Sequence, residues 1–413
     1  MAAESSPPRE GSSSLPVDLA GSGEILYVSS VDVSVGNGPG VNEREFITAL
    51  HSAMGSRAHF LIPKPAGLVP DLPESACTFT LPHRRHHPLH FLAHCFSKVK
   101  LARELVARRP FDLLVFRLDV LPLAILLITR SLETPYALKT LGQNSLKILD
   151  SRGGWVGRSL KRLNRWMVRQ VVSGAIVADS VTRLQAEFLT RSLDLDAEKI
   201  VCIDNAVNTN RFRRSDPELA RGELGLEDYD PIIGYVGSRP SERGGMALVE
   251  AAAQLSPKYS RLGVLIVGDG PGMESLRARA RELGVDDRCV LTGYVPFDRV
   301  PVHINALDVA VSISCLEDRR AASELKVRQY LACGKPVVIS AGGNEFVASE
   351  DLGSVVPASE GDAIVAALDR WLSLSPAQSE EFARRAEDYM RRHLSMESAI
   401  ARRFGLWEGR LRG

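Results

Sequence analysis

Three glycine-rich turns, each directly after an apolar run, are the first features of the chain that could do chemistry. They lie at residues 36–40, 237–245 and 268–272. Such a turn can bring backbone N–H groups and a helix N-terminus up to an anion. None of them matches the dinucleotide spacing G-x-G-x-x-G or the P-loop. Arg239 and Arg243 lie in the second turn, and a guanidinium group is suited to binding a diphosphate.

A second candidate stretch lies at residues 306–338, where the pattern predicts a strand, a polar loop, a helix, a Gly-Lys-Pro turn and another strand. Lys326 falls at the start of the predicted helix at 326–333.

These turns must be positioned by the apolar runs around them. Runs of 4–6 apolar residues predict strands that are buried on both faces, as in a parallel sheet. The predicted strands are 24–28, 59–62, 112–116, 136–140, 174–178, 200–203, 232–236, 262–267, 289–291, 309–312 and 336–340. Helices are predicted between them, including 42–54 and 246–255, so the unit is strand, helix, strand.

The series of strands restarts near residue 231, after a polar and turn-rich segment at 208–230. This predicts an α/β protein with two doubly wound, Rossmann-like parallel-sheet domains, and a cleft between them as the default ligand site. The expected divisions are a disordered tail at 1–22, a first domain at 23–212, a second domain at 213–395 and a C-terminal amphipathic helix at 396–413.

Composition excludes several classes of protein. The 413 residues carry 51 Lys+Arg against 50 Asp+Glu, a net charge of +1, which argues against nucleic-acid binding through bulk charge. The six cysteines are scattered without a Cys-x-x-Cys pair, so neither a disulfide framework nor a zinc site is expected. No signal peptide is expected, and the longest apolar run, 121–128, is shorter than the ~18–20 residues of a membrane span. A cytoplasmic protein is therefore expected.

Several segments resemble retaining glycosyltransferases of family 4, which have the GT-B fold. The turn at 236–244 resembles the family's V-G-R-x-x-x-x-K-G loop, and 267–271 resembles its V-G-x-G-P turn. The segments 177–180, 203–212 and 292–295 are similar to three further motifs, the last of which passes the nucleobase. With the stretch at 306–338, these motifs follow one another in the family's order.

The resemblance implies transfer of a glycosyl unit from a nucleotide-sugar to an acceptor hydroxyl, with retention at the anomeric carbon and without a bound metal or other cofactor. The catalytic residues it implies, which would offset the charge of the leaving diphosphate, are Arg239, Arg243 and Lys326. The implied donor-binding residues are Gly237, Gly268, Gly270, Val295, Glu317, Glu324, Leu325, Val327 and Gln329. The implied acceptor-binding residues are Gly38, Pro39 and Gly40, as a closing loop, with Asn42, Lys139, Thr140 and Asn144.

The sequence also departs from the family pattern. The family's two glutamates, eight positions apart, are replaced by Ala321 and Gln329, so that Glu317 or Glu324 would have to substitute. Ser238 stands where the family usually has Arg, and the acceptor-side His expected after 136–140 is missing. Two other hypotheses follow: a non-catalytic subunit that binds a sugar nucleotide or a partner enzyme, and a nucleotide-sugar hydrolase or epimerase with the same fold.

Four charged segments remain. His86, His90 and His94 are spaced for one helix face, which suggests a metal site, a solvated basic loop, or contact with an anionic acceptor or membrane. The basic amphipathic segment at 155–169 indicates a surface helix, or one lying on anionic lipid. The pair Asp194 and Asp196 is interpreted as part of a polar turn. Glu43, Arg44, Glu45 and Asp119 are interpreted as surface or helix-cap charges.

The acceptor is left open among a glycan, a lipid-linked molecule and a small molecule. Peripheral contact with the inner membrane face is compatible with the basic segments of the first domain, and no nucleic-acid partner is expected.

Overall fold

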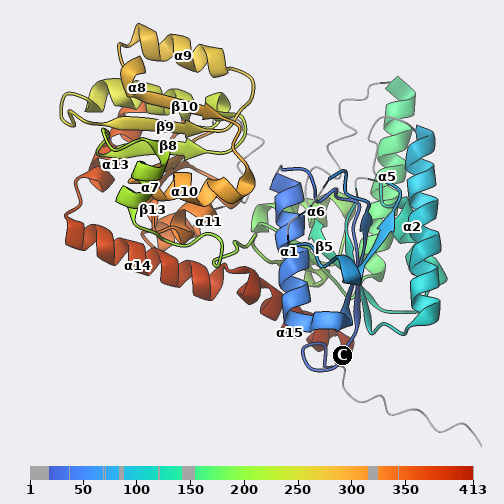
Figure 1. Ribbon diagram of the computed structural model, residues 1–413. Coiled ribbons are helices and arrows are strands. Elements are labelled where there is room, and N and C mark those ends of the chain that lie inside the picture. Colours follow the sequence, from blue (N-terminus) through green and yellow to red (C-terminus); the bar gives the residue numbers. More distant parts are fainter. Residues whose placement is uncertain are drawn as a thin grey trace, which may run out of the picture.

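A computed structural model describes residues 18–36, 38–67, 69, 71–82, 88–119, 121–141, 154–314, 324–342 and 344–412. It contains two parallel sheets, one in each half of the chain, and helices cover both faces of each sheet (Figure 1). The predicted fold class is therefore confirmed.

The first sheet has seven strands in the order β3-β2-β1-β4-β5-β6-β7. Ile25 of the central strand β1 is in register with Ala58 on one side and with Leu113 on the other. The strands are β1 Ile25–Val28, β2 Ala58–Pro63, β3 Cys77–Thr80, β4 Leu113–Arg117, β5 Tyr136–Leu141, β6 Val177–Ser180 and β7 Ile200–Cys202.

The two faces of this sheet are covered by different helices. Alternate strand residues such as Leu26 and Phe116 pack against α2, α3, α5 and α6, whereas Tyr27 and Val115 pack against α1 and the C-terminal helix. The helices of this half are α1 Gly38–Met54, α2 Pro88–Arg108, α3 Leu123–Ser131, α5 Gly154–Gly174 and α6 Arg183–Leu193.

The second sheet has six strands in the order β10-β9-β8-β11-β12-β13. Its strands are β8 Ile232–Val236, β9 Gly263–Val267, β10 Cys289–Gly293, β11 Val309–Ser312, β12 Val337–Ser340 and β13 Gly353–Val356. Its helices are α7 Pro217–Leu224, α8 Gly245–Leu255, α9 Met273–Glu282, α10 Val300–Asn305, α11 Leu325–Ala332, α12 Phe346–Ser349, α13 Gly361–Leu372 and α14 Pro376–His393.

The C-terminal helix α15, Met396–Arg412, returns to the first domain (Figure 1). Its side chains Ile400, Phe404 and Trp407 are buried in the same core as Phe46 of α1. Arg403 is also buried, and its Nε donates to Asp179 Oδ2 at the end of β6 at 2.7 Å. Because both charges are buried, this ion pair fixes α15 to one position on the sheet.

The structure corrects the expected start of order. Residues 1–17 lie outside the described residues, but 18–22 are not part of a disordered tail. Leu19 is fully buried, and Arg57 Nη1 donates to the carbonyl oxygens of Leu19 at 3.0 Å and of Gly23 at 3.1 Å. The buried side chain of Leu19 and the hydrogen bonds from Arg57 therefore hold the residues before β1 in a defined position.

Several elements also differ from their predicted bounds. Helix α1 begins at Gly38 rather than at 42, so the three residues Gly38, Pro39 and Gly40 form its first turn and not a loop. Strand β6 lies at Val177–Ser180 rather than 174–178, because α5 continues to Gly174. Strands β3 and β13 were not predicted, since each is short and lacks a continuous apolar run.

Within the described part of the chain, no helix is both long enough and apolar enough to cross a membrane. The apolar run 121–128 lies in α3, whose Ala124, Ile125 and Ile128 are buried. The five cysteines in the described ranges have free thiols. Burial raises the pKa of Cys333 to about 12, so this thiol is not a reactive nucleophile at neutral pH.

Candidate functional site

Each sheet has one point at which the strand order changes direction. In the first sheet this point lies between β1 and β4, and in the second it lies between β8 and β11. Loops diverge there at the carboxyl ends of the strands and leave a crevice in which α/β proteins bind ligands. The segments that follow these four strands are therefore the first places to examine.

The turn after β8 is packed directly against the turn after β9. Gly237 N donates to Val267 O at 2.9 Å, and a Cβ on Gly268 would lie 1.9 Å from Gly237 O. Gly268 also has φ +124, which side chains rarely adopt. A glycine is thus required at position 268, and the two turns form one layer of exposed backbone at the sheet edge.

Arg239 belongs to the first of these two turns, and its guanidinium is paired with a carboxylate. Its backbone has the left-handed φ of +59, and its Nη2 donates to Glu242 Oε1 at 2.6 Å. Its Cα would lie 2.9 Å from a Cβ at Gly270. The paired guanidinium is half exposed, so an incoming anion would have to compete with Glu242 for it.

Arg243, four residues further on, is in a different position. It lies just before α8, is partly buried, and its backbone oxygen accepts a hydrogen bond from Ile313 N at 3.1 Å. Its Nε is buried without a hydrogen-bond partner, and no ion pair links its guanidinium to any residue in the described ranges. A buried guanidinium N–H without a partner is costly, and an anion at this position would remove that cost.

Lys326 lies beneath the same turn. It is 8% exposed, and its Nζ donates to Tyr235 Oη at 2.8 Å. Tyr235 Oη in turn donates to Ser238 O at 2.8 Å, and a Cβ on Gly237 would lie 3.3 Å from the Lys326 Cε. A second positive charge is therefore held against the backbone layer by a hydrogen-bonded tyrosine.

Helix α11 begins at the end of this crevice. Its N-cap residue Glu324 accepts a hydrogen bond from the hydroxyl of Ser312, the last residue of β11. Val327 is fully buried, whereas Leu325 and Gln329 line a small pocket between the two domains. Gln329 thus faces the first domain.

That pocket brings predicted donor and acceptor residues together. Its lining includes Asn42 of α1 opposite Leu325 and Gln329. Asn42 Nδ2 also donates to Asn205 Oδ1 at 2.9 Å, in the segment that follows β7. Nearby, Tyr294 is exposed and its hydroxyl would lie 3.6 Å from a Cβ on Gly36, so the segment containing Val295 also approaches the first domain.

Glu43 was interpreted as a surface charge, and this is wrong. It is fully buried, and its carboxylate accepts hydrogen bonds from Tyr27 Oη at 2.7 Å, from Arg117, and from Lys139 Nζ at 3.4 Å. Burial alone would raise the pKa of Glu43, but Arg117 and Lys139 lower it to about 2. Burial likewise lowers the pKa of Lys139 to about 8 against the opposing effect of Glu43.

This cluster changes the expectation for Lys139. The side chain is 2% exposed, and its Nζ lies 4.2 Å from the centre of the Phe46 ring. In this conformation it therefore holds α1 to the sheet and presents no free face to an acceptor. The side chain of Thr140, together with Asn144 and Glu317, lies outside the described residues.

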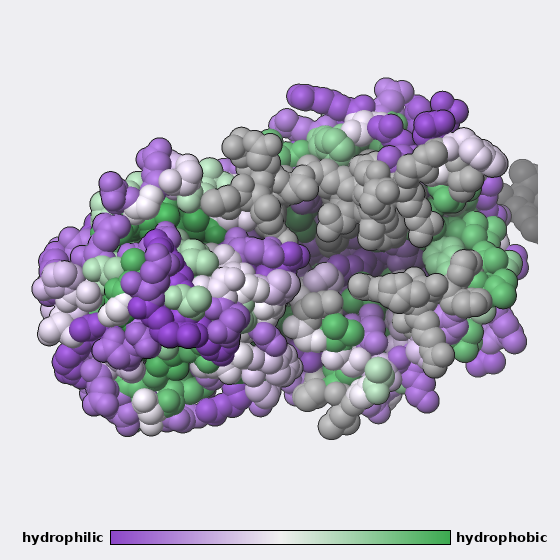
Figure 2. Space-filling model, turned by 90° about the horizontal axis from the view of Figure 1, so that it is seen from above, coloured by the Kyte–Doolittle hydropathy of each residue, from purple (hydrophilic) through white to green (hydrophobic). Residues whose placement is uncertain are grey.

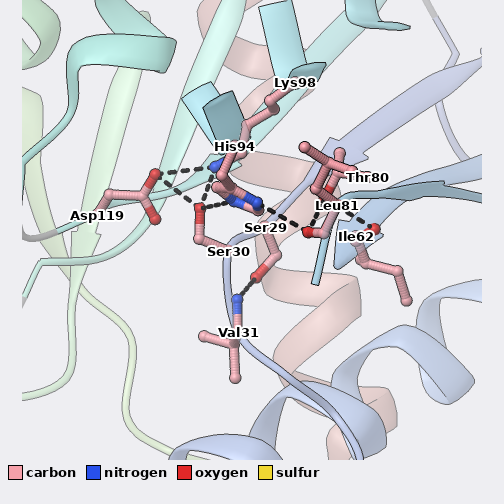
Figure 3. A network of polar contacts seen from close by, with 9 residues as sticks. All are labelled: Ser29, Ser30, Val31, Ile62, Thr80, Leu81, His94, Lys98 and Asp119. Atoms are coloured by element: carbon pink, nitrogen blue, oxygen red, sulfur yellow. Dashed lines mark hydrogen bonds and ion pairs between the residues drawn. The ribbon is translucent and has the colours of Figure 1, made fainter. Parts of the chain in front are cut away.

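The crevice of the first sheet contains a polar network that the sequence did not reveal (Figure 3). Ser30 Oγ, after β1, donates to Asp119 Oδ2 at 2.9 Å, and Asp119 follows β4. Lys98 of α2 is 1% exposed, donates to the Ser30 hydroxyl, and lies 3.0 Å from Asp119 Oδ2. Asp119 is thus a carboxylate with a buried counter-ion at the point where the strand order reverses, and not an isolated surface charge.

His94 supports this network through both of its ring nitrogens. Its Nδ1 donates to Leu81 O at 2.9 Å, and its Nε2 lies 3.5 Å from Ser30 Oγ (Figure 3). His90 Nε2 contacts Pro82 O at 2.6 Å. Within the described ranges, which exclude 83–87, no group of three His, Cys, Asp or Glu side chains could hold a metal ion. Pro88 is the first residue of α2, so His90 and His94 lie on one continuous helix.

Sequence reasoning missed Ser30, Lys98 and Asp119 because their partners lie on three separate elements. One signal was available: Ser30 and Asp119 both lie within three residues of the end of a predicted strand, 24–28 and 112–116 respectively. Asp194 and Asp196 are structural, since Asp194 pairs with Arg169 at 3.0 Å and Asp196 caps a short helix.

Comparison with known sequences gives matches to glycosyltransferases over part of the chain. The family model for glycosyl transferases group 1 matches residues 230–373. The chain is 30% identical over 234 residues to the 2-deoxystreptamine N-acetyl-D-glucosaminyltransferase of Streptomyces fradiae, covering 56% of this chain and 53% of that protein. It is 29% identical over 233 residues to a GDP-mannose-dependent phosphatidylinositol monomannoside mannosyltransferase of Mycolicibacterium smegmatis, covering 54% and 59%. The chain thus spans about half the length of the curated relatives it matches.

Comparison with solved structures extends over both domains. Sucrose-phosphate synthase of Thermosynechococcus elongatus superposes with a TM-score of 0.69 at 19% identity, covering 94% of this chain and 98% of that one. HepE of Anabaena in complex with UDP gives a TM-score of 0.69 at 16% identity, covering 92% and 99%. At these identities the likeness shows the fold alone. The chain therefore has the GT-B fold, and its residues 230–373 carry the pattern of the glycosyl transferases group 1 family.

Proposed function

We propose that this protein is a glycosyltransferase that moves a sugar from a nucleotide-sugar donor to a hydroxyl group of an acceptor, with retention at the anomeric carbon and without a metal ion. The acceptor hydroxyl oxygen forms a bond to the anomeric carbon, while the bond from that carbon to the diphosphate oxygen breaks. The nucleoside diphosphate leaves with the electron pair and takes up the proton of the hydroxyl group.

The observation that carries the proposal is the unpaired guanidinium of Arg243 beside the backbone layer of the second crevice. Its buried Nε has no partner in the described part of the chain, and Lys326 adds a second cation beneath the same turn. Two fixed positive charges are suited to a leaving diphosphate, because they stabilise charge that develops as the sugar–phosphate bond breaks. This role is otherwise often filled by a divalent ion.

The comparisons support this donor class. Two relatives are named for hexosyl transfer, one of them GDP-mannose-dependent, and a structural neighbour binds UDP. For the acceptor, the network of Ser30, Lys98 and Asp119 supports a site in the first crevice. A carboxylate at the sheet edge can accept a hydrogen bond from a hydroxyl group.

Nucleotide binding tests the donor site most directly. We expect the full chain to bind UDP or GDP by calorimetry, and Arg243→Gln to weaken that binding about 10- to 100-fold, as expected for a hydrogen bond to a charged group. Arg384→Gln, on the exposed face of α14, is the matched control and should bind normally. Equal affinity of Arg243→Gln and the control would contradict the assignment.

Turnover separates the remaining alternatives. A transferase should consume donor at a rate that depends on acceptor, unchanged by EDTA, and should give a product with the donor's anomeric configuration by NMR. Donor consumption that does not need an acceptor would indicate a hydrolase or epimerase. Binding without turnover across a panel of hydroxylated acceptors would indicate a non-catalytic subunit.

A further inference from the structure

Large apolar side chains are exposed at one end of the first domain. Leu89, Leu92 and Phe96 lie three and four positions apart on the first turns of α2, where they share one face. Leu89 is 71% exposed and Phe96 is 62% exposed. The opposite face of the same turns carries the buried residues His94 and Cys95, so these apolar side chains point away from the core.

Helix α5 presents a similar face. Trp155 is 74% exposed, and Trp166, eleven residues later, is 45% exposed. At 3.6 residues per turn these two tryptophans lie on the same side of the helix. Asn164 and Met167 on the other side are buried against the sheet. Both tryptophans therefore occupy the solvent face of α5.

Helix α3 joins the two faces, because it packs against both α2 and α5. Its Leu127 is partly exposed, and its Arg130 guanidinium lies 5.5 Å from the centre of the Trp166 ring. In Figure 1, α2 and α5 lie on the side of the first sheet away from α1. Figure 2, seen from above, shows a hydrophobic area at this outer edge of the domain. We name the exposed side chains of α2, α3 and α5 the outer apolar face.

This face is bordered by positive charge. Helix α5 contains no acidic residue, and it carries five basic ones: Arg158, Lys161, Arg162, Arg165 and Arg169. The sequences of α2, α3 and α5 contain a single acidic residue, Glu104. Arg158 and Arg162 are exposed and form no ion pair with another described residue.

We propose that the outer apolar face docks on the surface of an anionic phospholipid bilayer. Aromatic and aliphatic side chains flanked by arginines are the composition of a helix that lies in a membrane interface, where its apolar side chains enter about 5–10 Å deep. Basic residues near an anionic leaflet strengthen the attachment further. A second copy of this chain is a poorer partner, because it would oppose one set of five basic residues to another.

The outer apolar face lies at the same end of the first sheet as the proposed acceptor crevice. Helix α2 follows β3 and α5 follows β5 in the chain, so both helices begin at the carboxyl end of the first sheet. The network of Ser30 and Asp119 lies at that same end. Docking would bring the bilayer beside the proposed acceptor crevice, which favours an acceptor held in the membrane; this consequence rests on the proposed function, whereas the docking itself does not.

Vesicle sedimentation of the full chain tests the docking. We expect the protein to pellet with vesicles that contain about 30 mol% phosphatidylglycerol and to stay in solution with pure phosphatidylcholine. The bound fraction should fall when salt is raised to about 0.5 M, where exposed charges are strongly screened.

Two matched pairs of variants locate the contact. Leu89→Ser/Phe96→Ser/Trp155→Ser should weaken the partition at least about tenfold. The control Leu219→Ser/Val355→Ser, which changes exposed apolar residues of the second domain, should not. Arg158→Gln/Arg162→Gln should lower binding to anionic vesicles, and Arg384→Gln/Arg392→Gln should leave it unchanged. Near-ultraviolet circular dichroism confirms that each variant is folded.

Three results would overturn the proposal: no binding to anionic vesicles at low salt, equal binding by the apolar variant and its control, or a dimer in light scattering that the apolar variant abolishes. The last result would show that the face binds a second copy. Because the vesicle assay uses no donor, docking and the proposed function fail separately. A chain that pellets but binds no nucleotide refutes only the function.

Discussion

Glu43→Gln is the substitution whose effect follows most directly from the structure. The carboxylate is fully buried and is shared by Tyr27, Arg117 and Lys139. A pKa of about 2, against an ordinary value of 4.5, corresponds to about 3 kcal/mol of stability. Because the folded-state pKa is depressed, this stability is present above pH 4.5 and is lost as the pH falls toward 2.

The substitution leaves two buried cations without their anion. Lys139, whose pKa burial already lowers to about 8, can lose its proton, but the arginine stays charged. Removing one partner of a buried ion pair costs about 3–5 kcal/mol. We therefore expect Glu43→Gln to lower the free energy of unfolding of the first domain by about 3–4 kcal/mol at pH 7.

The measurement is hydrogen exchange of peptides from β1 and β4, because two domains can unfold separately and a single melting curve would mix them. Glu104→Gln, on the exposed side of α2, is the control and should cost less than about 0.5 kcal/mol. Between pH 7 and pH 3 the difference between wild type and Glu43→Gln should shrink by about 2 kcal/mol. A loss below about 1 kcal/mol at pH 7 would refute the reasoning.

Three further substitutions test other parts of the molecule. Gly268→Ala places a Cβ 1.9 Å from Gly237 O and should therefore destabilise the second domain by more than about 3 kcal/mol in urea unfolding. The control is Gly284→Ala, which has open space around its Cβ and should cost about 1 kcal/mol. Arg403→Met removes the guanidinium that is bonded to the buried carboxylate of Asp179, and it should cost about 3–5 kcal/mol in the exchange of α15 peptides; normal exchange there would contradict the anchoring role. Asp119→Asn should raise the acceptor KM about tenfold or more while nucleotide affinity stays within about twofold; an unchanged KM would remove Asp119 from the acceptor site.

The fold could be predicted because the central strands are long apolar runs. Ile232–Val236 is buried throughout, and such a run is stable only inside a sheet covered on both faces. The edge strand Cys77–Thr80 is only partly buried and carries two threonines, so its sequence resembles a turn as much as a strand. Strand β6 ends in Asp179 and Ser180, two polar residues that are typical of a loop. Asp179 can be buried in the strand because Arg403, 224 residues later in the chain, pairs with its carboxylate.

The candidate site could be predicted only in part, because the sequence does not show which charged side chains are paired with one another in the folded protein. Arg239 and Arg243 look equivalent in the sequence, yet the first is paired with Glu242 and the second has no ionic partner among the described residues. Glu43 and Asp119 looked like surface charges for the same reason. Their counter-ions Arg117 and Lys98 come from elements that meet only after the sheet has assembled.

The two crevices differ in charge in a way that suits two different substrates. In the second domain Arg243 and Lys326 supply positive charge, and the guanidinium of Arg243 has no ionic partner among the described residues. In the first domain the negative charge of Asp119 is balanced by buried Lys98. A crevice with excess positive charge favours an anion such as a nucleoside diphosphate, whereas one whose charges are internally balanced favours a neutral, hydroxyl-bearing molecule. This asymmetry would hold donor and acceptor on opposite sides of the cleft, which is the arrangement that transfer between them requires.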